Sequence, residues 1–321
     1  MKYVSQPIRI AGVTAKNRIV MPPMATYMAG ENGEVSQGNL DYYAARARGG
    51  HIGIITTEHF FITQQGKAKE RQISIASDTM TDGLKKLTAC LHQSGSLAVA
   101  QLNHAGTAAL RKVTGMDPAG PSAIRPAGSQ EDAEGVRAMT SDEIHALPGL
   151  FAAATGRAEK AGYDGVEIHA VHEGYLLDQF TLANMNYRTD QYGGSFENRY
   201  RFAVEIVQAI KSVCGKDFPV ALRYSVVSKT KGFGQGAVPG EEFTEFGRDM
   251  AESEKAIKYL EEAGYDMFDC DNGTYDAWYW AHPPVYMPEN CNLAEVEHIK
   301  NFTTKPVVCA GKMDPAKAAE E

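Results

Sequence analysis

The chain has 321 residues, of which 43% are hydrophobic and 22% charged, and its formal net charge at pH 7 is −8. This length fits one large α/β barrel or two ordinary domains, and the composition is that of a globular protein rather than a disordered or fibrous one. The acidic balance disfavours nucleic acid and anionic membranes as main partners. We therefore expect a soluble, cytoplasmic protein whose partner is a small molecule.

The sequence predicts no export signal, no membrane span and no metal site. Residues 1–9 lack the apolar core of a secretory signal, and no run approaches the roughly eighteen apolar residues of a spanning helix. The five cysteines, at positions 90, 214, 270, 291 and 309, form no Cys-x-x-Cys pair and no His/Cys cluster with metal-ligand spacing. We expect all five to be reduced.

The chain opens with a predicted hairpin and then repeats one pattern. Residues 8–16 resemble a small hairpin that turns at Ala11 and Gly12 and that could plug one end of a barrel. Afterwards an amphipathic stretch repeatedly ends at a glycine, and an apolar run follows within a few residues. Because glycine just past a helix can adopt the left-handed backbone of a C-cap, each instance predicts a helix end, a tight turn and a buried strand. These glycines are Gly49, Gly95, Gly162, Gly215 and Gly264.

Seven short runs are continuously apolar, as is typical of parallel strands covered on both faces. They are residues 19–21, 52–55, 97–100, 166–168, 220–222, 267–268 and 306–309. With helices between them, they predict a (β/α)8 TIM barrel whose eighth strand lies beyond the end of this chain. We treat residues 1–321 as one barrel domain truncated before that strand. Long segments follow residues 24, 103, 170, 225 and 270, which places a site at the strands' carboxyl ends.

Two helices near the middle of the chain carry clear end signals. Thr140 and Glu143 form a capping box, but Pro148 follows eight residues later, where proline costs about 3 kcal/mol inside a helix. We therefore expect two helical pieces after Thr140. Ser195 should cap the next helix, whose apolar residues recur at spacings of three and four and face the barrel.

Two histidines and a tyrosine follow the predicted strand at residues 166–168: His169, His172 and Tyr175. A phenol beside imidazoles can donate a proton to a carbon centre while the imidazoles polarise a neighbouring carbonyl. This suits addition of hydride and proton across an activated double bond, and a cofactor must supply the hydride. Two alternatives remain open. The imidazoles could cap local backbone groups, or they could bind a metal together with His51, His59, His104 or an acid.

Other strand ends offer partners for a flavin. Arg223 could hold the negative charge that develops at the N1/C2 carbonyl of a reduced flavin, and Gln101 could pair with the pyrimidine edge. Residues 21–26 contain two prolines, whose stiff backbone could lie along a flat ring. Each also has a structural alternative: an ion pair for Arg223 and a strand-end hydrogen bond for Gln101.

Two further loops could form walls of a substrate site. Residues 229–236 are basic and rich in glycine, so they could clamp an anionic group, although a flexible solvated loop is favoured. Residues 275–284 contain both tryptophans, Trp278 and Trp280. These rings could stack on an aromatic substrate, pack over the barrel or bury an oligomer interface.

Several stretches resemble the Old Yellow Enzyme superfamily of flavin-dependent ene-reductases, and together they span nearly the whole chain. They are residues 17–24, 101–106, 120–124, 169–180, 190–199 and 310–311. Within this superfamily, the His-Ala-Val-His-Glu-Gly-Tyr sequence at 169–175, with residues 236–245 and 275–284, is most similar to the clostridial 2-enoate reductases.

The resemblance implies a barrel that binds FMN and passes hydride from flavin N5 to the β-carbon of an α,β-unsaturated carboxylate or carbonyl. Tyr175 is then the proton donor to the α-carbon, and His169 and His172 hold the substrate's oxygen. The implied FMN contacts are Pro23, Met24, Ala25, His59, Gln101, Arg223, Gly311 and Lys312. We place Tyr27, Trp278 and Trp280 on the substrate side.

The chain also departs from the family pattern. It has one residue more between His169 and Tyr175 than the simplest members, and Lys312 stands where many relatives have arginine. Full-length enoate reductases add an iron-sulfur cluster and a nucleotide-binding region, so FAD, a 4Fe-4S cluster and NADH are expected only in a longer parent. A homo-oligomer is possible. The alternatives are a same-family reductase of dienoyl-CoA, steroid or tetrapyrrole substrates, a metal-dependent barrel hydrolase and a non-catalytic fragment.

Overall fold

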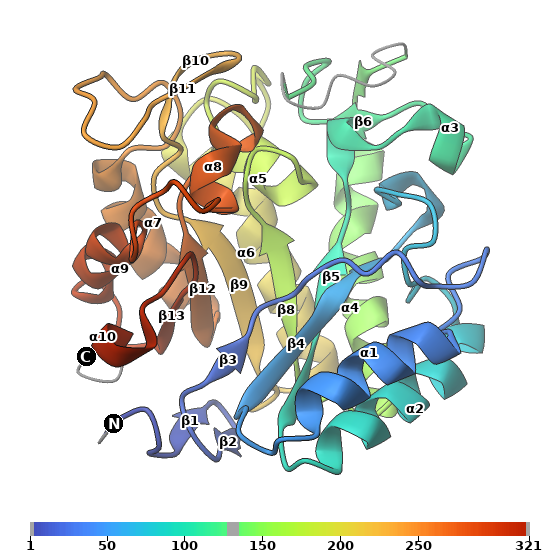
Figure 1. Ribbon diagram of the computed structural model, residues 1–321. Helices are drawn as coiled ribbons and strands as arrows, with labels where there is room; N and C mark the ends of the chain where they lie inside the picture. The colour runs from blue at the N-terminus through green and yellow to red at the C-terminus, as the bar shows by residue number, and fades with distance from the viewer. Residues whose placement is uncertain (1–2, 127–134, 319–321) are drawn as a thin grey trace.

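The computed structural model describes residues 3–126 and 135–318 and contains a sheet of seven parallel strands curled into a nearly closed barrel (Figure 1). The strands are bonded in the order β13-β12-β9-β8-β5-β4-β3, so each lies beside its neighbour in the chain. They are β3 (Val20–Met21), β4 (Ile54–Phe61), β5 (Leu97–Asn103), β8 (Gly165–Ala170), β9 (Val220–Ser225), β12 (Met267–Asp271) and β13 (Val307–Cys309). The predicted barrel architecture is confirmed.

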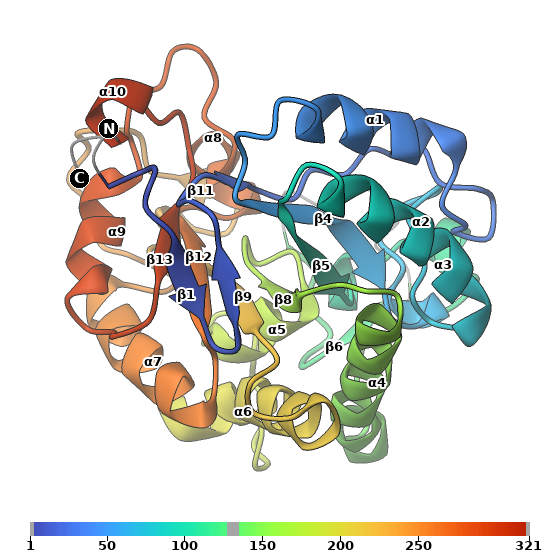
Figure 2. The same ribbon diagram turned by 90° about the horizontal axis from the view of Figure 1, so that it is seen from below.

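Helices surround this sheet, as the view from below shows (Figure 2). The longer ones are α1 (Gln37–Ala47), α2 (Thr81–His92), α4 (Ser141–Lys160), α6 (Phe196–Cys214), α7 (Met250–Ala263) and α9 (Leu293–Lys300). Short helices lie in the loops: α3 (Arg111–Thr114), α5 (Leu176–Thr181), α8 (Trp278–Ala281) and α10 (Pro315–Ala318). Three small pairs of strands complete the fold: β1 (Ile8–Ile10) with β2 (Val13–Ala15), β6 (Ala119–Gly120) with β7 (Arg137–Ala138), and β10 (Thr230–Gly232) with β11 (Gln235–Gly236).

The predicted helix ends are largely confirmed. Ser195 accepts a hydrogen bond from the backbone of Asn198 at the start of α6, and Gly215 and Gly264 end α6 and α7. Four of the five glycines predicted from the repeating pattern have a positive φ, but at the first joint Gly50 has it instead of Gly49.

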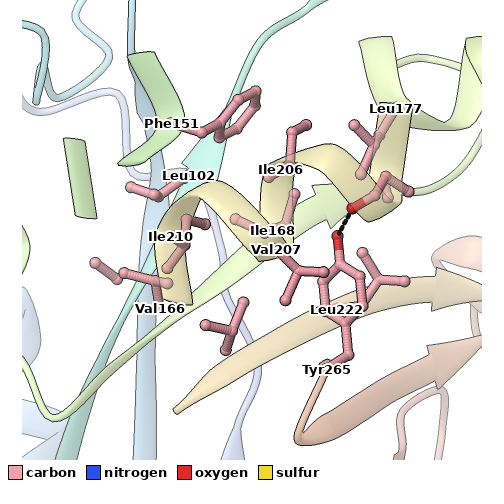
Figure 3. Packing of buried hydrophobic residues seen from close by; sticks show 14 of the residues in the cluster. Leu102, Phe151, Val166, Ile168, Leu177, Ile206, Val207, Ile210, Leu222 and Tyr265 are labelled. Atoms are coloured by element: carbon pink, nitrogen blue, oxygen red, sulfur yellow. Dashed lines mark hydrogen bonds between the residues drawn. The ribbon is translucent and has the colours of Figure 1, made fainter. Parts of the chain in front are cut away.

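The main core lies between the outer face of the sheet and the helices. Leu102, Val166, Ile168 and Leu222 point outward from β5, β8 and β9 and pack with α4 and α6 (Figure 3). Each fully buried aliphatic side chain of this kind contributes roughly 1.5–3 kcal/mol. Because side chains alternate along a strand, the residues between them point into the barrel.

The amino-terminal hairpin closes one end of the barrel, as predicted. Ile10 and Ala15 of the hairpin are buried in one cluster with inward-facing Ile54, Val99 and Met267. Figure 2 shows β1 and β2 lying across this end, below the strands. The interior is therefore apolar at the hairpin end, and any polar chemistry inside the barrel lies toward the carboxyl ends.

Most main strands continue farther than predicted at their carboxyl ends. The prediction stopped β4 at Ile55, β5 at Ala100 and β9 at Leu222, whereas they extend to Phe61, Asn103 and Ser225. The polar residues that seemed to end each apolar run point into the barrel, while their outward neighbours still pack against helices. The candidate residues His59, Gln101, His169 and Arg223 therefore lie within strands, which hold their backbones rigidly.

The expectation of two helical pieces after Thr140 is wrong. The capping box at Thr140 and Glu143 is present, but α4 runs unbroken through the buried Pro148. Proline removes the backbone hydrogen bond to Ile144, and burial of Ile144, Leu147 and Phe151 on the same helix offsets this cost. The favourable packing keeps α4 as one element.

All five cysteines are free thiols. Within residues 3–126 and 135–318, no helix combines the length and the apolarity needed to cross a membrane.

Substitution of Ile206 tests how much the core between α6 and the sheet contributes to the free energy of unfolding. Ile206 is fully buried, so Ile206→Ala should lower the free energy of unfolding by about 2–5 kcal/mol through lost burial and a new cavity. Val213→Ala in the same helix is the matched control: Val213 is 60% exposed, and the change should stay within about 0.5 kcal/mol. Urea unfolding measures both. Equal losses in the two variants would contradict this account of the core.

Candidate active site

Polar side chains from neighbouring strands meet inside the barrel near its carboxyl end. The sheet register pairs Gln101 of β5 with Glu167 of β8, His169 of β8 with Arg223 of β9, and Arg223 with Asp269 of β12. The Gln101–Glu167 pair thus precedes the aligned set of His169, Arg223 and Asp269 by two residues of β8, so the inward side chains form two successive layers. The structure thus brings together Gln101, His169 and Arg223, three of the residues predicted from sequence.

Arg223 lies between two buried aspartates that the sequence analysis did not single out. Its guanidinium forms an ion pair with Asp269 at 2.7 Å and another with Asp271. Burial disfavours the charge on Arg223, but the carboxylates of Asp269 and Asp271 outweigh this effect and raise its pKa. Asp271 also binds His172, whose Nε2 lies 2.9 Å from Oδ2. The ion-pair alternative for Arg223 is therefore present, and it links β9 and β12 to the loop after β8.

Gln101 is likewise engaged within the barrel. Its Nε2 donates to Oε1 of Glu167 at 2.8 Å, and both side chains are buried. Burial raises the pKa of Glu167 well above that of an ordinary carboxyl, with the nearby Asp269 as a further cause. Burial therefore favours the protonated, uncharged form of Glu167.

A second group of rings lies at the barrel mouth: His59, His169 and Tyr175. The centroids of His169 and Tyr175 are 3.9 Å apart, and His59 lies 5.6 Å from His169 and 5.7 Å from Tyr175. Burial lowers the pKa of His59 to about 4 and that of His169 well below its usual value. Both imidazoles are therefore neutral near pH 7. Burial, followed by the neighbouring Tyr275, raises the pKa of Tyr175, which stays protonated.

The turn that carries Tyr175 is strained and closely fitted. His172 and Glu173 both have a left-handed backbone, with φ of 62° and 61°, which costs non-glycine residues about 1–3 kcal/mol each. Gly174 follows because a Cβ there would lie 1.6 Å from the Tyr275 ring. The backbone N–H of Glu173 donates to Asp178, and fully buried Arg248 pairs with the same carboxylate at 2.7 Å. These bonds hold the turn in place.

Glu173 itself is a buried acid that sequence reasoning missed. Its Oε1 accepts a hydrogen bond from Asn184 Nδ2 at 3.0 Å, and only 1% of the residue is exposed. Burial raises the pKa of Glu173 to about 8, with the nearby Asp276 and Asp178 adding to the effect. The signal in the sequence was the one additional residue between His169 and Tyr175, the segment in which Glu173 lies.

The two tryptophans of residues 275–284 have different surroundings. Trp278 is 41% exposed and lies in a column of rings, stacked on Tyr275 at 5.0 Å and on His282 at 4.2 Å. Its edge also faces His172 at 5.8 Å. Trp280 is buried, and its Nε1 donates to the carbonyl of Ala237 at 2.7 Å. Trp278 thus lies beside the site, whereas Trp280 fixes the loop that contains β10 and β11.

The loop after β3 crosses the barrel mouth and is bound to β4. Met24, Ala25 and Tyr27 are exposed, and Tyr27 has a positive φ of 55°. Thr26 donates from Oγ1 to Oε1 of the buried Glu58 at 2.7 Å. Partial burial of the Tyr27 phenol raises its pKa, and the carboxylate of Glu58 raises it further. This loop could cover one side of a flat ligand bound at the mouth.

The residues at the mouth suit the polar ring of FMN better than its phosphate. Among the described residues, buried atoms without a hydrogen-bond partner include the side-chain oxygen and nitrogen of Asn103 and Nδ1 of His59 and of His169. Such groups indicate a polar ligand, because buried polar groups are normally hydrogen-bonded. At the phosphate end, Lys312 Nζ donates to the carbonyls of Val285 and Met287, so this amine is already used. Across the described part of the chain, no group of three or more His, Cys, Asp or Glu is arranged to hold a metal ion.

Comparison with known proteins identifies the family. The model of the NADH:flavin oxidoreductase / NADH oxidase family matches residues 4–321. The chain belongs to this family. It is 39% identical to a cinnamate reductase of Clostridium sporogenes over 100% of this chain and 49% of that protein. It is also 35% identical to an NADH oxidase of Thermoanaerobacter brockii over 98% of this chain and 46% of that protein.

The solved structure of an old yellow enzyme homologue from Zymomonas mobilis has a TM-score of 0.81 and 28% identity, covering 99% of this chain and 84% of that chain. These matches confirm the resemblance to the Old Yellow Enzyme superfamily and to a clostridial reductase. The chain spans about half the length of the two relatives named above.

The buried Glu173 predicts a pH dependence of stability. Because its pKa of about 8 in the folded protein exceeds the ordinary value of 4.5, the folded state keeps a proton that the unfolded chain loses between these values. The free energy of unfolding should therefore fall as the pH rises from about 4.5 to about 8. Glu173→Gln, which keeps an acceptor for Asn184, should flatten this fall.

Urea unfolding at evenly spaced pH values between about 5 and about 8 measures the free energy of unfolding of the wild type and of Glu173→Gln. Glu70→Gln is the control, because Glu70 is exposed and this change should leave the profile parallel to that of the wild type. A parallel profile for Glu173→Gln would show that Glu173 is ionised in the folded protein.

Proposed function

We propose that this chain is the FMN-binding barrel of an NAD(P)H-dependent ene-reductase that acts on an α,β-unsaturated carboxylate or carbonyl. The observation that supports this most is the contact of protonated Tyr175 with neutral His169 at the mouth of a flavin-oxidoreductase barrel. When bound, FMN supplies the hydride that is added to the β-carbon. The protein supplies binding, orientation and the proton.

The chain offers a set of groups for the flavin ring. The loop of Pro23, Met24 and Ala25 would lie along it, and Gln101 and Arg223 would approach its polar edge from inside the barrel. Since two aspartates balance Arg223, the site would carry little excess positive charge toward the ring. We keep Gly311 as a contact near the phosphate, with its backbone rather than the Lys312 amine as the polar group.

Tyr175 is proposed to protonate the α-carbon. Its phenol keeps its proton across the neutral pH range because burial and Tyr275 raise its pKa. It is the N-cap residue of α5, and it packs against the buried alanines 68, 105 and 109, so its position is well fixed. A carbon that becomes strongly basic as hydride arrives at its neighbour can take a proton from such a phenol.

His169 is proposed to hold the substrate's oxygen. The ring is neutral and partly exposed beside Tyr175, so its N–H can donate to a carbonyl or carboxylate oxygen. That bond stabilises the charge that develops on the oxygen as hydride adds to the conjugated system. His172 lies next to this position and is fixed by Asp271.

The position of Trp278 favours the proposal that the substrate is planar and aromatic. Its ring is partly exposed and forms a column with Tyr275 and His282 beside the site, an aromatic surface that a planar substrate could contact. The cinnamate reductase among the relatives is named for such a substrate. In a longer parent of the relatives' length, we propose electron delivery from NADH through FAD and a 4Fe-4S cluster.

Purified protein tests this function directly. We expect a yellow chromophore that is released as FMN on denaturation, or uptake of added FMN by the apoprotein. After anaerobic reduction with dithionite, addition of cinnamate should reoxidise the flavin and yield the saturated acid. Protein that neither contains nor takes up FMN, or whose reduced flavin is not reoxidised by any of cinnamate, cinnamaldehyde and cyclohexenone, would refute the proposal.

Tyr175→Phe should separate proton transfer from flavin reduction. Loss of the proton donor should slow alkene reduction by about 10²–10⁴-fold, while reduction of the flavin by its electron donor stays unchanged. Rapid mixing measures the two half-reactions separately. Tyr187→Phe is the control, because Tyr187 is 61% exposed and this change should affect neither. Equal slowing of both half-reactions by Tyr175→Phe would rule out this role.

A further inference from the structure

His59 is brought to the barrel mouth by an irregularity in β4. The register between β4 and β5 pairs Thr57 with Ala100 and then Phe60 with Leu102, so β4 has one extra residue at this point. A bulge of this kind re-aims the side chains that follow it. Ile54 points into the barrel, and regular alternation would place position 58 inward as well. After the bulge, Glu58 instead binds Thr26, and His59 faces His169 and Tyr175.

The imidazoles of His59 and His169 each have one nitrogen that finds no partner among the described residues. Nδ1 of His59 is buried without a hydrogen bond, and the same is true of Nδ1 of His169. His59 is only 6% exposed. Burying an imidazole nitrogen without a hydrogen bond is unfavourable, so two such nitrogens on rings that lie side by side indicate a ligand that completes their bonding.

His172 is committed elsewhere. Its Nε2 is bound to Asp271, a carboxylate that can only accept, so Nε2 carries a proton that is used within the protein. The ring lies on the side of Trp278 and His282, at 5.8 and 6.3 Å. The Nε2–H of His172 is therefore used by Asp271 and is not available to a substrate's oxygen.

We propose that His59, in place of His172, is the second donor that holds the substrate's oxygen together with His169. This inference rests on the proposed function and refines it. The family resemblance places His59 among the cofactor contacts. The inference assigns it to the substrate instead.

The distances agree with one oxygen between the two rings. Their centroids are 5.6 Å apart and the ring planes meet at 70°, so an oxygen can lie near 2.9 Å from a nitrogen of each ring. Tyr175 faces both rings, at 3.9 and 5.7 Å. An oxygen fixed between the imidazoles would hold the adjacent α-carbon within reach of the phenol. Two neutral donors suit a carboxylate as well as a carbonyl, because each gives a charge-assisted bond to the anion.

Variants of His59 and His172 in the FMN-loaded protein test the inference. His59→Phe removes the N–H and keeps a ring, whereas His59→Gln keeps a donor. The Kd of cinnamate for the oxidised holoprotein, followed by the change in flavin absorbance, should rise about 10- to 100-fold in His59→Phe. His59→Gln should recover most of this loss, and His59→Ala repeats the test in a variant with less steric demand.

A double-mutant comparison shows whether the two imidazoles act on one oxygen. If they do, the double variant with His59→Phe and His169→Phe should weaken cinnamate binding by less than the product of the single effects. His172→Phe should raise the Kd less than His59→Phe does. FMN content should match the wild type in His59→Phe.

Several results would overturn the inference while leaving the proposed function intact. They are an unchanged Kd in His59→Phe and His59→Ala, a loss of FMN in these variants with unaltered cinnamate binding, or a larger effect of His172→Phe than of His59→Phe. If the wild type neither holds FMN nor reduces an alkene, the proposed function fails first, and the inference fails with it.

Discussion

The pairing of Arg223 with Asp269 and Asp271 is the interaction on which the arrangement of the site depends. It joins adjacent strands β9 and β12 inside the barrel, and Asp271 extends it to His172 in the loop after β8. A buried ion pair of this kind adds little net stability, but removing one partner costs about 3–5 kcal/mol because a charge is left unpaired. The cluster therefore acts mainly by allowing only one arrangement of β8, β9 and β12 at their carboxyl ends.

This charged layer separates the barrel interior into an apolar region toward the hairpin and a polar region toward the mouth. Toward the hairpin, Ile54, Val99 and Met267 pack against Ile10 and supply burial. Toward the mouth, neutral imidazoles and a protonated phenol lie where polar atoms still lack partners. The rigid strands carry His59 and His169 directly. Tyr175 lies outside a strand, and it is the Arg248 to Asp178 ion pair that holds its turn against the strain at His172 and Glu173.

The fold and the centre of the site follow from local sequence patterns. Apolar runs after C-capping glycines predict the order of strands and helices, and the cluster of His169, His172 and Tyr175 marks the mouth of the barrel. The prediction of a helix break near Pro148 failed, because burial against the barrel keeps Pro148 within α4. The contact of Lys312 with the carbonyls of Val285 and Met287 likewise depends on distant partners. Neither contact is visible in the neighbouring residues of the chain.

The sequence by itself determined the barrel, its family and the residue types at the strand ends. Only the tertiary structure decided which of those residues face one another. Strand alternation predicts that Asp269 and Asp271 point inward with Arg223, but their pairing requires β9 and β12 to be adjacent and in register. His59 points to the mouth because one extra residue in β4 reverses the alternation, and His172 turns to Asp271 after a left-handed turn. A bulge and a turn are set by pairing between segments far apart in the chain, so local sequence could not reveal them.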